Sequence, residues 1–127
     1  HGKLPQVPPT VRLLPGWFNE TLPHFLDESR GPVVFAHLDA DLYESTLVVL
    51  STLASRCRLC AGTVLAFDEL FGSPSLEQQE WRALNDVSQR YGLAFSFISY
   101  MAHANSAFGR AAIQITSVPH CVPRHGA

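Results

Sequence analysis

Apolar and polar positions form alternating blocks along the chain, and these blocks predict strands followed by helices. The apolar run 33–38 predicts a strand that is buried on both faces, as in a parallel sheet. Residues 43–57 then carry apolar side chains at helical spacing. The same change recurs further on, where a β-rich run at 63–67 precedes an inward stripe over 81–91 that Gly92 closes. The repeated unit is a strand followed by a helix.

Shorter signals complete the order of elements. Residues 11–14 predict a strand, Thr21 is a cap for the helix after it, and Ser75 begins a capping box before the last helix. Two closing strands are predicted at 94–101 and 110–116. The order is therefore β-α-β-α-β-α-β-β, which predicts an α/β fold with a mostly parallel sheet, helices on both faces and one antiparallel strand from the closing pair.

The length of 127 residues suits one domain. We expect an irregular lead-in at 1–10, the α/β domain at 11–116 and a C-terminal tail at 117–127. The net charge of -2 and the scattered arginines argue against a nucleic-acid partner. No apolar run approaches the roughly 18 residues that a membrane helix needs, so no membrane association is expected.

The chain has three cysteines, Cys57, Cys60 and Cys121, and this small odd number does not predict a disulfide framework. A reducing, cytoplasmic location is the expectation. A zinc site of cysteines with His120 and His125 is disfavoured, because a second tight ligand pair with zinc spacing is missing.

Two predicted strands end in pairs of acids, Asp39 with Asp41 and Asp68 with Glu69. Ligands of open α/β sheets bind beyond the carboxyl ends of the strands, so these four groups are expected to converge at one sheet edge. Carboxylates at such distances repel one another, and a cation would offset that repulsion. An all-oxygen set favours a hard cation, Mg²⁺ first, with Mn²⁺ or Ca²⁺ as alternatives.

Each acid also has a structural interpretation. Asp41 could cap the following helix with Glu44 as its partner. Asp68 and Glu69 could belong to an ordinary turn between a strand and a helix. His37 is interpreted as a buried, hydrogen-bonded histidine in preference to a metal ligand.

Three segments resemble the later half of a known family: GWFNETLP at 16–23, HLDADLYEST at 37–46 and AGTVLAFDEL at 61–70. They are similar to the macrocin O-methyltransferases, which are class I, S-adenosylmethionine-dependent and divalent-metal-dependent enzymes of antibiotic and sugar biosynthesis. The resemblance extends from about Val11 to Ile115.

This resemblance implies a role for each acid. Asp39, Asp68 and Glu69 match the positions of the Mg²⁺ ligands, and Asp41 matches the general base. Glu69 stands where the family usually has aspartate, so its longer side chain changes the geometry of the site. The implied substrate is a hydroxyl group of a sugar or another small natural product.

The family holds its methyl donor on a glycine-rich turn after its first strand, and no G-x-G occurs in this chain. The resemblance therefore implies a partial Rossmann-like methyltransferase fold that lacks the first two βα units. S-adenosylmethionine is expected to bind only if that half is supplied, and activity of the chain alone is left open. The alternative is a non-enzymatic α/β module that binds a metal, a small ligand or a partner chain.

The strand at 33–38 would then have one unpaired edge, which invites pairing with another strand. Two outcomes are expected. Either residues 11–14 pair beside it, or two chains meet there as a homodimer.

Overall fold

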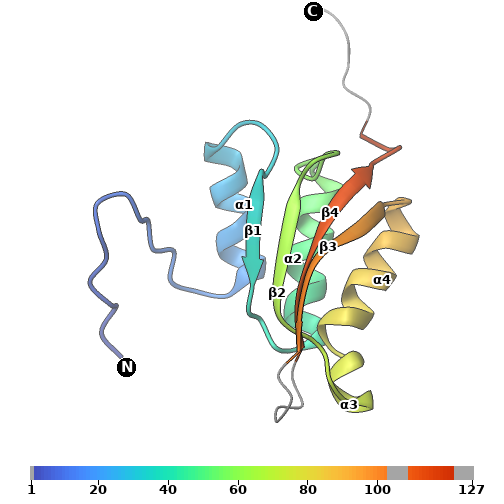
Figure 1. Cartoon of the computed structure of the whole chain (residues 1–127). Helices are drawn as coiled ribbons and strands as arrows, with labels where there is room; N and C mark the ends of the chain where they lie inside the picture. The colour runs from blue at the N-terminus through green and yellow to red at the C-terminus, as the bar shows by residue number, and fades with distance from the viewer. Residues whose placement is uncertain (1, 103–108, 122–127) are drawn as a thin grey trace, which may run out of the picture.

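A computed structural model describes residues 2–102 and 109–121 (Figure 1). Its elements in chain order are α1 (Phe18–Glu28), β1 (Phe35–Leu38), α2 (Tyr43–Ser55), β2 (Val64–Phe71), α3 (Pro74–Glu77), α4 (Glu80–Tyr91), β3 (Ala94–Ala102) and β4 (Gly109–Ser117). The α/β class is therefore confirmed. In the described part of the chain no helix is long and apolar enough to cross a membrane.

The sheet is mixed, and the expectation of a mostly parallel sheet was wrong. Its strand order is β1-β2-β4-β3. Of its three pairings, only β1 with β2 is parallel, whereas β4 pairs antiparallel with both β2 and β3. The closing hairpin explains this order, because β4 folds back beside β3 and enters the position next to β2. Most of the predicted polar connection at 103–109 lies outside the described residues.

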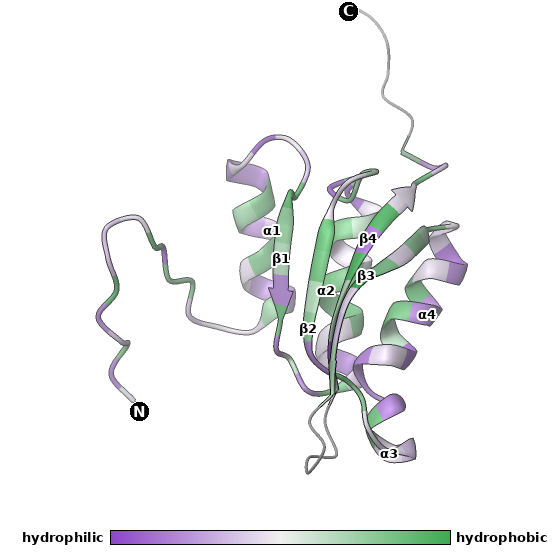
Figure 2. Cartoon of the chain, viewed as in Figure 1, coloured by the Kyte–Doolittle hydropathy of each residue, from purple (hydrophilic) through white to green (hydrophobic). Residues whose placement is uncertain are grey.

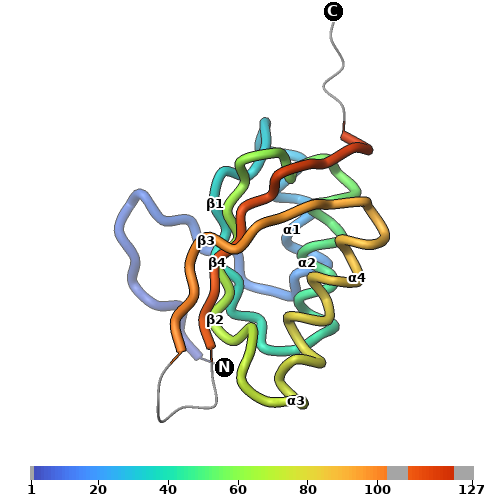
Figure 3. The backbone as a smooth tube through the Cα atoms, turned by 45° about the vertical axis from the view of Figure 1, so that its right-hand side comes forward, coloured from blue at the N-terminus to red at the C-terminus, as the bar shows by residue number. Residues whose placement is uncertain are grey.

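The helices α1, α2 and α4 lie together on one side of the strands, with α2 between the other two (Figure 3). Helices on both faces were expected, and this was wrong for the described residues. Crossovers between strands of the same direction are right-handed. Both crossovers here, through α2 and through α4, move across the sheet in the same direction, so both helices are placed on the same face.

Apolar side chains from the covered face of the sheet and from the helices form the core. Leu65, Phe67 and Ile113 alternate along their strands with more exposed residues, and each is at most 1% exposed. Leu50 and Leu84 meet them from α2 and α4. Apolar colour covers β1 up to its purple arrowhead and much of β2 and α2, whereas hydrophilic residues interrupt α4 (Figure 2). The predicted inward stripe of α4 is confirmed, since Leu84 and Val87 are buried.

Strand β1 is an edge of the sheet and is not buried on both faces as predicted. Val34 is 77% exposed and Phe35 is 60% exposed, while Leu38 is buried. Residues 11–14 form no strand, so the expectation that they pair beside β1 was wrong. The N-terminal coil instead leads away from the sheet (Figure 1). Pairing with a second chain stays a prediction.

The helix boundaries differ from the predicted caps in two places. Thr21 lies inside α1, which has Trp17 as its N-cap residue, and the Thr21 hydroxyl donates to the Trp17 carbonyl. Helix α3 is capped by Ser73 rather than Ser75, since the Ser73 hydroxyl accepts a hydrogen bond from the Leu76 N–H. Gly92 ends α4 in the left-handed conformation, as predicted.

Cys57 and Cys121 form a disulfide, with their Cα atoms 5.4 Å apart, although the small, odd number of cysteines did not predict one. Cys57 follows α2 at a positive φ of 53°, and this turn directs its side chain outward instead of onto the apolar face of the helix. A zinc site that used these two thiolates is excluded by the bond. His125 lies outside the described residues.

Replacement of Cys121 by serine should lower the free energy of unfolding by about 4 kcal/mol, because the disulfide closes a loop of 64 residues in the unfolded chain. Urea unfolding without reductant measures this change. Cys60→Ser is the matched control, since Cys60 is free, and it should unfold like the wild type. Two additional titratable thiols in the unreduced wild-type protein would contradict the pairing.

Candidate functional site

The parallel pairing of β1 with β2 brings the acid-bearing segments to the same end of the sheet, beyond the last paired residues of the two strands. Leu38 pairs with Phe67 in this ladder, so the next residues, Asp39 and Asp68, follow the last matched pair. Both strands run toward the same edge, at the bottom of Figure 1. The predicted convergence of the two segments at one edge therefore has a structural basis in this register.

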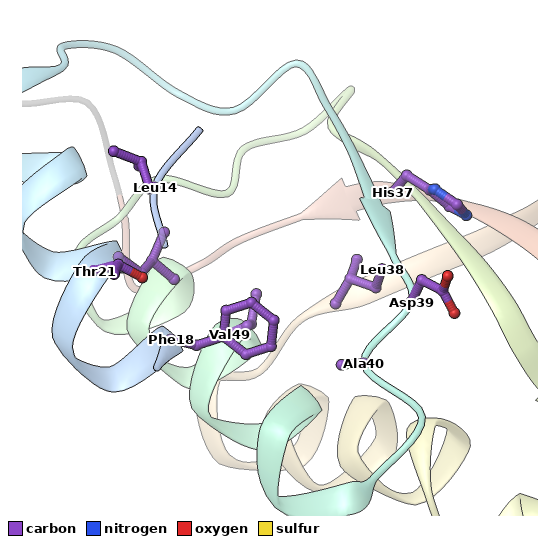
Figure 4. A pocket seen from close by; sticks show the side chains of 9 residues that line it. Leu14, Phe18, Thr21, His37, Leu38, Asp39, Ala40 and Val49 are labelled. Atoms are coloured by element: carbon purple, nitrogen blue, oxygen red, sulfur yellow. The ribbon is translucent and has the colours of Figure 1, made fainter. Parts of the chain in front are cut away.

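Asp39 is exposed and lies at the rim of a pocket of about 390 Å³ between α1, β1 and α2. Leu38, Phe18 and Val49 contribute apolar surface to this pocket. In the close view, the Asp39 carboxylate points to the same side of β1 as His37 and away from Leu38 (Figure 4). The pocket is therefore largely apolar, and the Asp39 carboxylate points away from its apolar wall (Figure 4).

Asp41 is exposed and has a positive φ of 61°, which is uncommon for a residue other than glycine. The N-cap of α2 is Leu42, so the interpretation of Asp41 as the helix cap was wrong. Another side chain satisfies the start of this helix, because the Tyr43 N–H donates to Gln79 Oε1 at 2.8 Å. The Asp41 carboxylate is thus not used to cap α2.

Asp68 lies inside β2, which continues to Phe71, so its interpretation as part of an ordinary turn was wrong. The pairing of β2 with β4 is irregular between Phe67 and Phe71, and Asp68 and Glu69 occupy this irregular stretch. Asp68 Oδ1 lies 3.2 Å from Arg110 Nε and 3.9 Å from His37 Nε2.

His37 was expected to be buried, but its side chain is 53% exposed on the uncovered face of the sheet. No helix of the described residues covers that face (Figure 3), which explains the difference. Its neighbour Arg110, from β4, was not identified from the sequence. The Arg110 guanidinium and the His37 imidazole each place a nitrogen atom close to the Asp68 carboxylate.

The Glu69 carboxyl group is affected by the charges of the other three predicted acids. Its pKa is raised above the ordinary value first by partial burial, and then by the negative charges of Asp41, Asp68 and Asp39. Asp39, Asp41 and Asp68 therefore each lie within electrostatic range of Glu69. This crowding is the arrangement that a bound cation would relieve.

The donor chemistry of these four carboxylates suits a hard cation. Within residues 2–102 and 109–121, however, no three His, Cys, Asp or Glu side chains are arranged to hold a metal ion. Asp68 already contacts Arg110 and His37. The metal-ligand roles of Asp39, Asp68 and Glu69 stay a prediction, as does the role of Asp41 as a base.

Glu80 is a fifth acid at this edge, and it was missed from the sequence. Its side chain is fully buried at the start of α4. Oε1 accepts a hydrogen bond from the Ala40 N–H at 3.2 Å, and Oε2 accepts one from the Glu69 N–H at 3.3 Å. Glu80 therefore bridges the two segments that carry the predicted acids.

Burial raises the pKa of Glu80 to about 7, although the backbone N–H groups of Glu69, Ala40 and Asp41 favour its charged form. An acid in the first turn of a helix is normally explained by the helix dipole. Because that explanation suffices for Glu80 in the sequence, its hydrogen bonds to the two acid-bearing segments could not be predicted.

The raised pKa of Glu80 predicts that stability falls as the pH rises from about 5 to about 7. In this range the folded state binds more protons than the unfolded state, so the free energy of unfolding decreases with pH, by a few kcal/mol at most, since one pKa unit is about 1.4 kcal/mol. Urea unfolding at several pH values, in EDTA, measures the slope. Glu80→Gln should flatten it, whereas Glu77→Gln, at an exposed position of α3, should leave it unchanged. An equal slope in Glu80→Gln would contradict the prediction.

Comparison with known proteins gives the family. Residues 5–91 match the family described as macrocin-O-methyltransferase (TylF), and this range includes both acid pairs and Glu80, although it ends before β3, short of the expected Ile115. A similar protein is the 8-demethyl-8-(2,3-dimethoxy-alpha-L-rhamnosyl)-tetracenomycin-C 4'-O-methyltransferase of Streptomyces olivaceus, with 36% identity over 84 residues. Those residues are 66% of this chain but only 28% of that enzyme. The chain belongs to the macrocin O-methyltransferase family.

Proposed function

We propose that this chain forms the acid-bearing, acceptor-side part of an S-adenosylmethionine-dependent O-methyltransferase that acts on a hydroxyl group of a sugar or small natural product. The observation that carries the proposal is that the register of β1 with β2 places both acid pairs beyond the matched residues Leu38 and Phe67, with the other three acids within electrostatic range of Glu69. The family membership over residues 5–91 supports the same chemistry.

In this proposal Asp39, Asp68 and Glu69 would hold a divalent cation, Mg²⁺ or else Mn²⁺ or Ca²⁺. The cation would supply a positive charge that lowers the pKa of the acceptor hydroxyl. Asp68 contacts both Arg110 and His37, so these side chains would have to release its carboxylate to a cation.

Asp41 would be the general base. Its carboxylate is exposed and is not used to cap α2. It would accept the proton that the acceptor hydroxyl loses as its oxygen takes the methyl group. Because Asp41 follows Ala40, whose N–H is held by Glu80, its backbone position is fixed relative to Glu69.

The acceptor would approach from the side of the pocket between α1, β1 and α2. Asp39 is one of its lining residues, and the apolar wall of Leu38, Phe18 and Val49 offers a surface for the less polar face of a sugar or for an attached ring. The similar enzyme is named for methylation at a 4'-oxygen of a rhamnosyl-tetracenomycin. This name supports a glycoside as the substrate class.

The methyl donor would be bound mainly by a part of the Rossmann-like methyltransferase fold beyond these 127 residues, because the chain has no G-x-G turn. The length comparison with the similar enzyme, of which the matched residues span 28%, supports this division. Donor binding by the chain as it stands is therefore expected to be weak.

A cation titration tests the metal site. Mn²⁺ or Mg²⁺ should raise the melting temperature of the chain, and Asp39→Asn should abolish this rise because one of three carboxylate ligands is lost. Asp27→Asn is the matched control, because Asp27 lies on α1 and pairs with Arg56 away from the site. An equal Mn²⁺-induced rise in Asp39→Asn and in wild type would reject the assignment of Asp39.

Calorimetry with S-adenosylmethionine separates the enzyme proposal from a non-enzymatic module that binds only a metal, a small ligand or a partner chain. Weak donor binding that Mn²⁺ strengthens supports the proposal for this chain. No heat at millimolar donor rejects donor binding by these residues. The open edge of β1 favours the partner-chain alternative, and a dimer mass in light scattering would support it.

A further inference from the structure

The fully buried carboxylate of Glu80 reaches both acid-bearing segments at once, one oxygen to each. Its partners Ala40 and Glu69 are 29 residues apart in the chain, with Ala40 in the connection after β1 and Glu69 in β2. Apart from the ladder of β1 with β2, this is a direct tie between the two segments. The distance between the backbones after β1 and near the end of β2 is thus set by one side chain.

The neighbours of Glu80 hold the adjoining part of the same segment. Gln79 Oε1 accepts the Tyr43 N–H at 2.8 Å, and Asp86 Oδ2 accepts the Tyr43 hydroxyl at 2.7 Å. The Arg82 guanidinium stacks over the Tyr43 ring, 4.5 Å from its centre. The N-cap residue of α4 and three side chains of its first two turns therefore contact this segment at Ala40 and Tyr43.

A merely structural explanation is weaker for Glu80 than for its neighbours. A first-turn acid that serves the helix dipole can remain in solvent, as exposed Glu77 does in α3. A carboxylate buried beside other acids is unfavourable unless both oxygens are satisfied, and here both are bonded to backbone N–H groups of the predicted site. An apolar residue would fill the space but could not tie the two segments.

We propose that Glu80 is a positioning residue: its carboxylate fixes the backbone of the segment of Asp39 and Asp41 relative to that of Asp68 and Glu69, from which these side chains would reach a cation. This inference rests on the proposed function. Mutation of a residue that hydrogen-bonds to metal ligands typically changes the metal affinity by about 10-fold to 100-fold.

The test compares wild type, Glu80→Gln and the matched control Glu77→Gln. Glutamine preserves the size of the side chain, but its NH₂ group would face one of the two N–H donors, so one tie is lost. Amide hydrogen exchange without metal should become about tenfold faster in Glu80→Gln at whichever of Ala40 and Glu69 faces the NH₂ group, and stay unchanged at core residues such as Ile113. The dissociation constant for Mn²⁺, from calorimetry, should rise by about tenfold or more.

Unchanged exchange at Ala40 and Glu69 in Glu80→Gln overturns the inference, and so does faster exchange with an unchanged Mn²⁺ dissociation constant. Glu80→Asp, which is one methylene too short to reach both donors, should fall between wild type and Glu80→Gln. If wild type binds no Mn²⁺, the proposed function fails, and the exchange rates alone then decide whether Glu80 holds the two segments.

Discussion

The parallel ladder between β1 and β2 is the constraint on which the candidate site depends. It pairs Leu38 with Phe67, and both side chains are buried against the helices. A slip of one residue in this ladder would exchange the two faces of a strand and expose one of these side chains. The apolar core therefore sets the position of the acids that follow, although none of them belongs to it. The register of β1 with β2 therefore determines both the packing of the core and the position of the candidate site.

The crowding of carboxylates at this edge is balanced within the chain itself. Arg110 and His37 approach Asp68 from the uncovered face of the sheet, and Glu80 shifts toward its neutral form through burial. A cation that enters the site would therefore compete with Arg110 for Asp68 and would not fill a site without counter-charge. Asp68 is thus already paired with Arg110, and in the described residues no three of the acids are arranged as metal ligands.

The repeating strand–helix units and the two acid pairs could be predicted because period and strand ends are local signals. The arrangement of the sheet could not, since the insertion of β4 beside β2 depends on where the closing hairpin folds back. The exposure of His37 follows from that arrangement. Asp41 has the sequence signature of a helix cap, but Gln79 from a distant element satisfies Tyr43 instead. Glu80 and the Cys57–Cys121 bond likewise depend on contacts between distant residues, and a single sequence does not reveal them.

The left-handed backbone at Asp41 determines which substitutions report on its carboxylate. Asparagine tolerates this conformation about as well as aspartate, whereas alanine is strained there because its Cβ approaches the carbonyl oxygen. An alanine scan would thus mix a backbone shift next to Ala40 with the loss of a charge. The amide replacement removes the charge alone, which makes it the interpretable probe at this position.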